Sequence, residues 1–311
     1  MPDLPLVMIS NPMVGLMKPG LEAAGYEVAQ RWELTPDQAV RVRAIVHVGE
    51  FLLEPEFLAT LPKLGLIAHV SVGYDGVDVP WCRARGIAVS HAEGLNADDV
   101  ADQAMGLLIA AWRNIVAGDR VIREDRWNNA DRMRPPGGLK GRKIGVMGLG
   151  HIGAAVAVRA QAFGMIPAWW GPNPKPQAPW PRAESLLALA ADSDILMVAC
   201  RADSSNRKAV SQAVIEAVGP RGLIVNVARG SVIDEDALIA ALKDGRLGRA
   251  ALDVFETEPT PASRWADVPN VVLTPHTAGG TTESLPLMIG QTFENLQRFF
   301  AGEPLASPVA G

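Results

Sequence analysis

Short apolar runs alternate with amphipathic helical patterns along most of the chain. In the first hundred residues, apolar runs at 6–9, 44–48 and 64–72 predict strands, and the patterns at 21–24 and 55–61 predict helices between them. Strands that alternate with helices are typical of a parallel sheet with helices on its faces. The first part of the chain is therefore predicted to be a small α/β unit.

A long helix follows, and after it the alternation resumes. Asn96 is a predicted N-cap, Asp98 and Asp99 lie in the first turn, and apolar positions continue to Ala111. The segment 127–138, rich in Arg, Asn, Pro and Gly, is predicted to be an exposed arm. Beyond it the pattern predicts strands at 143–147, 166–170 and 194–199 and helices at 152–163 and 183–190. Such an alternation predicts a doubly wound parallel sheet.

The length of the chain calls for more than one core. A chain of 311 residues is too long for one ordinary core, so two domains are expected. The last helical pattern, at 282–300, has no strand after it and is expected to pack back on the first domain. The chain is thus predicted to be one domain interrupted by another.

The composition narrows the class of protein. Hydrophobic residues make up 48% of the chain and charged residues 20%, which is typical of a globular protein. The net charge is −5 and no basic run stands out, which argues against a nucleic-acid partner. The two cysteines, Cys82 and Cys200, form no metal or redox motif, so no metal is expected. Because neither a signal peptide nor a membrane-spanning stretch is evident, we expect a cytoplasmic protein without a membrane partner.

A glycine-rich turn lies between the strand at 143–147 and the helix at 152–163. Its sequence is Gly148-Leu149-Gly150-His151-Ile152-Gly153. The first two glycines permit a tight turn and a close approach of a pyrophosphate to backbone N–H groups, and the helix N-terminus adds a partial positive charge. We therefore predict that a dinucleotide is bound by Gly148, Gly150, His151, Ile152 and Gly153.

The residues after the second strand of this sheet indicate which dinucleotide is preferred. A chain that selects NAD places Asp or Glu there to bind the ribose 2′-hydroxyl. This chain instead has Gly171, Asn173 and Lys175 in that segment. No carboxylate would repel a 2′-phosphate, so NADP(H) is predicted to be preferred over NAD(H). In the alternative interpretation, Lys175 is a solvated loop charge and either cofactor is accepted.

Three ionisable residues each follow an apolar run that is typical of a strand. Arg229, Glu258 and His276 come after the runs at 223–228, 250–255 and 271–275. In a parallel sheet these residues would converge where the dinucleotide lies. A guanidinium binds a carboxylate bidentately and a histidine donates a proton near neutral pH, which is the chemistry that reduces a 2-keto acid. In the alternative interpretation they are structural residues, and Glu256 competes with Glu258.

Several segments together resemble the D-isomer-specific 2-hydroxyacid dehydrogenases. They are residues 70–78, 148–153, 226–230, 252–259 and 274–279. The likeness covers essentially the whole chain in the right order. It implies a doubly wound (Rossmann) coenzyme domain at 97–280, inserted into a smaller flavodoxin-like α/β substrate domain made of 1–96 and 281–311. It also implies a homodimer.

The resemblance assigns a role to each site residue. Arg229 would bind the carboxylate and carbonyl of a 2-keto acid, and the N–H groups of Val72 and Gly73 would hold the carboxylate. His276 would protonate the developing alkoxide, with Glu258 hydrogen-bonded to its ring. Asp253 would meet the nicotinamide amide group, and the remaining predicted cofactor contacts are Cys200, Val227 and Gly279. The segment 201–206 departs from the family pattern, so contacts near the cofactor ribose stay open.

The sequence predicts the type of reaction but leaves several substrates open. The resemblance favours NADPH-dependent reduction of glyoxylate or hydroxypyruvate to the D-2-hydroxy acid. The alternatives are aromatic keto acids such as hydroxyphenylpyruvate, phosphite or 3-phosphoglycerate oxidation, and a dinucleotide-sensing corepressor. The residues predicted to form the side-chain pocket are Phe51, Leu52 and Tyr74, joined by Met133 or Trp127 reaching across a dimer. These residue types do not indicate whether the substrate is small or aromatic.

Overall fold

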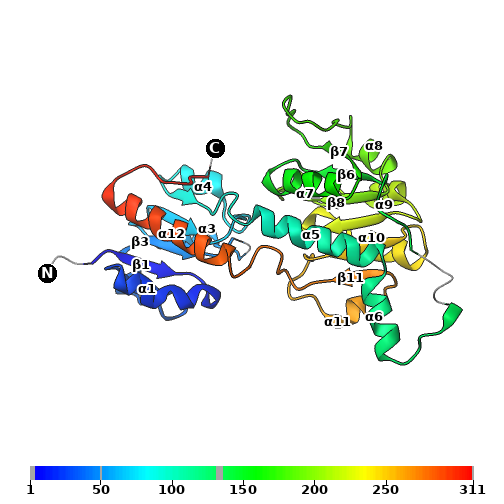
Figure 1. Ribbon diagram of the computed structural model, residues 1–311. Helices are drawn as coiled ribbons and strands as arrows, with labels where there is room; N and C mark the ends of the chain where they lie inside the picture. The colour runs from blue at the N-terminus through cyan, green and yellow to red at the C-terminus, as the bar shows by residue number, and fades with distance from the viewer. Residues whose placement is uncertain (1–3, 50, 131–135, 310–311) are drawn as a thin grey trace. The chain divides into compact units, whose positions relative to one another are not determined.

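The computed structural model describes residues 4–49, 51–130 and 136–309. The chain forms two compact units (Figure 1). The first unit comprises Met1–Asn96 together with Thr282–Gly311, and the second comprises Ala97–Thr281. No helix within the described ranges is long and apolar enough to span a bilayer.

The first unit is built on a five-stranded parallel sheet. Its strands are β1 (Leu6–Ile9), β2 (Glu27–Gln30), β3 (Val42–His47), β4 (Leu66–His69) and β5 (Ala88–Ser90). Their order across the sheet is β2-β1-β3-β4-β5, and every pair is parallel. This is the flavodoxin-like order, which confirms the predicted fold class of this unit.

Short helices and one long helix cover the first sheet. The helical elements are η1 (Pro12–Met17), α1 (Lys18–Ala23), η2 (Arg31–Glu33), α2 (Pro36–Ala39), α3 (Pro55–Leu58), α4 (Val79–Arg83) and α12 (Ser284–Ala301). The long helix α12 comes from the C-terminal part of the chain, as the last helical pattern predicted. Its Met288 and Leu296 are buried in one cluster with Val7 and Val46 of the sheet. The hydroxyl of Thr292 donates to the carbonyl of Met288 within the same helix.

The second unit contains a six-stranded parallel sheet. Its strands are β6 (Lys143–Met147), β7 (Ile166–Trp170), β8 (Ile195–Val198), β9 (Leu223–Asn226), β10 (Arg249–Leu252) and β11 (Val271–Leu273). The order is β11-β10-β9-β8-β6-β7. A single parallel bridge between Trp169 and Arg182 adds one more position beyond β7. With this position the order is that of a doubly wound dinucleotide-binding sheet, as predicted.

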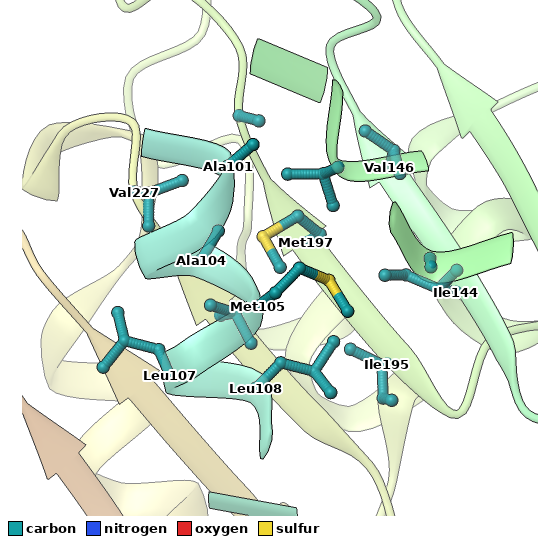
Figure 2. Packing of buried hydrophobic residues seen from close by; sticks show 14 of the residues in the cluster. Ala101, Ala104, Met105, Leu107, Leu108, Ile144, Val146, Ile195, Met197 and Val227 are labelled. Atoms are coloured by element: carbon teal, nitrogen blue, oxygen red, sulfur yellow. The ribbon is translucent and has the colours of Figure 1, made fainter. Parts of the chain in front are cut away.

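Helices lie on both faces of this second sheet. They are α5 (Ala97–Trp112), α6 (Ile115–Arg123), α7 (His151–Ala162), α8 (Leu186–Ala191), α9 (Gln212–Val218), η4 (Gly230–Val232), α10 (Glu235–Lys243) and α11 (Ala262–Trp265). Figure 2 shows Ala104, Met105 and Leu108 of α5 beside Ile195 and Met197 of β8. The burial of this apolar helix face fixes α5 on the sheet.

One predicted strand and one predicted helix are shorter in the structure than in the prediction. The apolar run at 64–72 forms a strand only over Leu66–His69, because residues 64–65 precede it and residues 70–72 bend away after it. The helix predicted to begin at 183 begins at Leu186, because the side chain of Ser185 accepts the N–H of Ala188 and caps it. The residues before that cap are free to form the bridge between Trp169 and Arg182.

Candidate active site

The predicted catalytic residues of the second unit all follow the carboxyl ends of neighbouring strands. Arg229 follows β9, Glu258 follows β10, and His276 follows β11. These three strands pair in parallel, so their carboxyl ends meet at one edge of the sheet. The glycine turn after β6 belongs to the same edge.

The structure brings Glu258 and His276 together. The Oε2 of Glu258 lies 2.6 Å from Nδ1 of His276. Because the carboxylate accepts, Nδ1 of His276 carries a proton. The Oε1 of Glu258 accepts the N–H of Phe255 at 2.8 Å, so both oxygens of this carboxylate are held. The two side chains remain 30% and 27% exposed, which leaves the ring open to a substrate.

The surroundings of Glu258 keep its carboxyl group ionised. Burial acts to raise its pKa, but the hydrogen bonds from the His276 ring and the Phe255 N–H act in the other direction. The positive charges of His276 and Arg229 add to this effect. The pKa of Glu258 is therefore lowered, and the carboxylate stabilises the protonated form of the histidine ring.

Asp253, which is 1% exposed, anchors the turn that carries His276. Its carboxylate accepts the N–H groups of Thr277 at 3.1 Å and Ala278 at 3.0 Å, and the hydroxyl of Thr274 at 2.5 Å. The N–H of His276 donates to the Asp253 carbonyl at 2.8 Å. His276 has a φ of 53°, a left-handed conformation that is costly outside glycine. These bonds hold the histidine in that conformation.

Asn226 supports the segment that carries Arg229. Its buried side-chain amide accepts the N–H of Ala228 at 3.0 Å and donates to the carbonyl of Arg229 at 2.9 Å. The Arg229 guanidinium itself donates to the carbonyl of Ala228 at 2.9 Å. The sequence contained the signal for Asn226, a polar residue that ends an apolar strand, but its supporting function was not predicted.

The glycine turn has the geometry that a pyrophosphate requires. Gly148 has a φ of +93°, and a Cβ there would lie 2.4 Å from Cα of Cys200. A Cβ on Gly153 would lie 2.0 Å from the carbonyl oxygen of Gly148. Helix α7 begins after Gly150 without a side-chain cap, and such a helix N-terminus favours an anion. The residues present therefore fit a dinucleotide.

The structure adds one residue to the predicted cofactor-specificity segment. Asn173 and Lys175 are exposed in the turn after β7, and Gly171 is buried at its start. The guanidinium of Arg182 donates to the carbonyls of Gly171 at 2.7 Å and Pro172 at 3.3 Å. In the described part of the chain no carboxylate pairs with it. Arg182 was missed because it lies eleven residues after Gly171, and no sequence pattern predicts the bridge with Trp169 that brings it back to β7.

The other predicted cofactor contacts lie in the same unit. Cys200 follows β8 and packs against Gly148, and burial raises the pKa of its thiol to about 11, so it stays neutral. Val227 is 6% exposed and belongs to the core cluster beneath α5. Gly279 lies in the turn after β11, two residues beyond Thr277. His151 and Ile152 begin α7.

In the first unit, Val72 and Gly73 lie in the turn that follows β4. The ring Nδ1 of His91 bonds to the carbonyl of Val72 at 2.9 Å. The hydroxyl of Ser71 donates to the carbonyl of Gly73 at 2.9 Å and accepts the N–H of Gly49 at 2.7 Å. Within the described ranges, neither Val72 nor Gly73 donates its N–H to another group of the chain. These contacts fix the carbonyls of the turn and leave its N–H groups for a ligand.

The predicted pocket residues are scattered over the two units. Phe51 and Leu52, which are 39% and 63% exposed, follow β3, and the ring of Tyr74 lies 5.0 Å from that of His91. Trp127 is 62% exposed. Met133 lies outside the described residues. The structure therefore does not test whether these residues form one side-chain pocket.

The fold and the site define a dinucleotide-dependent oxidoreductase, and comparison with known proteins gives its family. The NAD-binding domain of the D-isomer specific 2-hydroxyacid dehydrogenases matches residues 105–278. The chain belongs to this family. It is an NAD(P)-dependent 2-hydroxyacid dehydrogenase, an enzyme that in the reverse direction reduces 2-keto acids.

Three relatives illustrate the similarity. The chain is 38% identical to a hydroxyphenylpyruvate reductase of Plectranthus scutellarioides over 272 residues, which cover 88% of this chain and 87% of the relative. It is 39% identical to the structure of a 2-hydroxyacid dehydrogenase from Ketogulonicigenium vulgare, with a TM-score of 0.89 and 98% of each chain covered. It is 33% identical to an NADPH-dependent glyoxylate/hydroxypyruvate reductase from Sinorhizobium meliloti, solved with NADP and malonate, with a TM-score of 0.89 and 98% and 97% covered.

Proposed function

We propose that this enzyme uses NADPH to reduce glyoxylate or hydroxypyruvate to the D-2-hydroxy acid. The observation that carries the proposal is the Glu258–His276 hydrogen bond of 2.6 Å, with the charge of Arg229 acting on the same carboxylate. A proton donor and an anion-binding guanidinium thus stand at the sheet edge where the glycine turn receives the dinucleotide. The same arrangement is what 2-keto acid reduction needs.

Arg229 binds and orients the substrate. Its planar guanidinium stays charged at any working pH and matches the carboxylate of a 2-keto acid. The N–H groups of Val72 and Gly73 are proposed as further donors to that carboxylate. Binding of the carboxylate directs the neighbouring carbonyl oxygen toward an acid.

His276 supplies the proton. When bound, the reduced nicotinamide supplies a hydride to the carbonyl carbon. As negative charge develops on the carbonyl oxygen, Nε2 of His276 donates its proton there, and Glu258 stabilises the imidazolium that precedes this transfer. A positioned acid of this kind typically contributes about 10²- to 10⁴-fold to the rate. Asp253 is proposed to contact the nicotinamide amide group.

The preference for NADPH rests on the charges after β7. The turn after β7 has no carboxylate between Gly171 and Gln177, while Lys175 is exposed there. The Arg182 guanidinium, fixed on the carbonyls of Gly171 and Pro172, adds a second cation at the carboxyl end of β7. A ribose 2′-phosphate is a dianion, and these groups favour it over a hydroxyl.

The proposed substrate class is supported by the substrates named for the relatives. Relatives act on glyoxylate and hydroxypyruvate or, in one case, on hydroxyphenylpyruvate. The second candidate is therefore an aromatic 2-keto acid, which the exposed Phe51 and Leu52 would accommodate. Initial rates with glyoxylate, hydroxypyruvate and hydroxyphenylpyruvate, followed by chiral analysis of the product, separate the two.

The Arg182→Gln variant tests the cofactor preference within this proposal. The ratio of kcat/KM for NADPH to that for NADH should fall about tenfold or more, because a charged hydrogen-bond donor to the 2′-phosphate is lost. The NADH reaction of the same variant is the internal control. Equal losses with both cofactors would mean that Arg182 only shapes the turn.

The proposed homodimer is supported by apolar side chains on the surface of the second unit. Ile115, Val116 and Ile122 of α6 are 52%, 46% and 66% exposed. Burial of such a face in a subunit contact removes apolar surface from water. Light scattering after size-exclusion chromatography should give twice the mass of the chain, and a monomeric mass would refute the assembly.

A further inference from the structure

An open cavity of about 390 Å³ lies in the second unit, at the amino ends of its strands. Its walls include Trp112 at the end of α5, the arginines 142, 221 and 249, and Asp194. Arg142 and Asp194 directly precede β6 and β8, and Arg249 begins β10. The catalytic residues follow the carboxyl ends of this sheet. Strands of four to five residues separate the two edges by roughly 13–17 Å.

Two of the arginines are held by one aromatic ring. The guanidinium carbons of Arg142 and Arg249 each lie 5.5 Å from the ring centroid of Trp112. That ring is itself fixed, because Trp112 is 4% exposed and its Nε1 donates to the carbonyl of Gly138 at 3.1 Å. The cationic groups are therefore placed on a rigid wall rather than on free surface side chains.

Among the described residues, the carboxylates do not balance the positive charge of the cavity. Arg142 pairs with Oδ1 of Asp194 at 3.0 Å, and Oδ2 of the same carboxylate accepts the N–H of Lys143 at 2.9 Å. Both carboxylate oxygens of Asp194 are thus hydrogen-bonded within the protein. Over residues 4–49, 51–130 and 136–309, no carboxylate forms an ion pair with Arg221 or Arg249. Like charges held close together repel one another, and a bound anion would remove that cost.

We propose that this cavity binds a small phosphate-bearing anion, at a site separate from the dinucleotide site. Guanidinium groups match the oxygens of phosphate bidentately, and three of them line one cavity. The volume is within the usual range for an organic ligand. The proposal does not depend on which keto acid or coenzyme the enzyme uses.

Calorimetric titration of the full-length enzyme, saturated with coenzyme so that the glycine turn is occupied, tests the site. The probes are inorganic pyrophosphate and phenyl phosphate, which distinguish a free inorganic anion from a phosphate ester. We expect one additional site per chain, whose affinity falls at least tenfold in Arg249→Gln. Arg221→Gln, a change at an exposed side chain, should also weaken binding without a change in thermal stability. Tighter binding of phenyl phosphate would identify an ester as the ligand.

Arg85→Gln is the matched control. Arg85 also stacks on a tryptophan, at 3.8 Å from the ring of Trp81, but it is exposed and lines no part of this cavity. Its removal should leave the affinity for both probes unchanged. The proposal is overturned if the coenzyme-saturated enzyme binds neither probe, or if both cavity variants bind them as the wild type does. It is also overturned if Arg249→Gln changes only the oligomeric state.

Discussion

Glu258→Gln tests the proton donor of the proposed reaction. The carboxylate of Glu258 accepts on both oxygens, from the His276 ring at 2.6 Å and from the Phe255 N–H at 2.8 Å. A glutamine has one oxygen and one NH₂ group, so one of these two donors must face another donor. The variant also removes the negative charge that stabilises the protonated ring.

The size of the effect follows from the charge pair. Two unit charges about 4 Å apart attract by about 4 kcal/mol at an effective dielectric constant of 20, and a fully exposed pair is worth about 1 kcal/mol or less. The side chains are 30% and 27% exposed, so a value of about 1–2 kcal/mol is expected. This corresponds to about tenfold or somewhat more in the population of the protonated ring.

The assay is the pH dependence of kcat for keto acid reduction. Reduction needs the protonated ring, so the rate falls as pH rises; in Glu258→Gln this fall should begin about one pH unit lower. At pH 8 the variant should be about tenfold slower. Glu256→Gln is the control, because Glu256 pairs with Arg207 and not with the histidine. A Glu258→Gln profile that overlays the wild type, or an equal shift in Glu256→Gln, would show that Glu258 does not stabilise the protonated His276 ring.

Three further variants or conditions give separate tests. His276→Gln should lower kcat about 10²- to 10⁴-fold with a small change in KM, and near-normal turnover would mean that another group donates the proton. Arg229→Lys should raise KM for the keto acid and lower kcat, since the planar fork is lost; unchanged steady-state kinetics would remove Arg229 from the site. Burial lowers the pKa of His47 to about 4, so the unfolded chain takes up a proton below pH 6.5 that the folded chain does not. Urea unfolding should therefore show a loss of about 2 kcal/mol between pH 7 and pH 5, and His47→Gln should reduce that loss; equal pH dependence in both proteins would contradict it.

The sequence predicted the fold class because the relevant signals are local. Apolar runs followed by Arg229, Glu258 and His276 place those residues at one sheet edge once the strands are parallel. The glycine turn is likewise a contiguous segment with a strand before it and a helix after it. The family motifs repeat the same local information, and the comparisons confirm the family.

Contacts between segments that are separated along the chain could not be predicted from the sequence. Arg182 reaches the turn after β7 through one bridge, and nothing in residues 171–175 indicates it. The three cavity arginines come from three separate segments of the chain, and strand order decides that these segments meet. Asp253 was assigned to the nicotinamide by resemblance, whereas the structure also shows it holding the turn of His276 through three hydrogen bonds.

NADPH-dependent reduction of a 2-keto acid is tested most directly by the initial rate of NADPH oxidation with hydroxypyruvate. This rate is compared with the rate of NADH oxidation at the same cofactor concentration. We expect rapid turnover, a kcat/KM that is clearly higher with NADPH, and D-glycerate as the product. Turnover that favours NADH would contradict the cofactor assignment based on Lys175 and Arg182. No turnover of hydroxypyruvate or glyoxylate with either cofactor would contradict the proposed function itself.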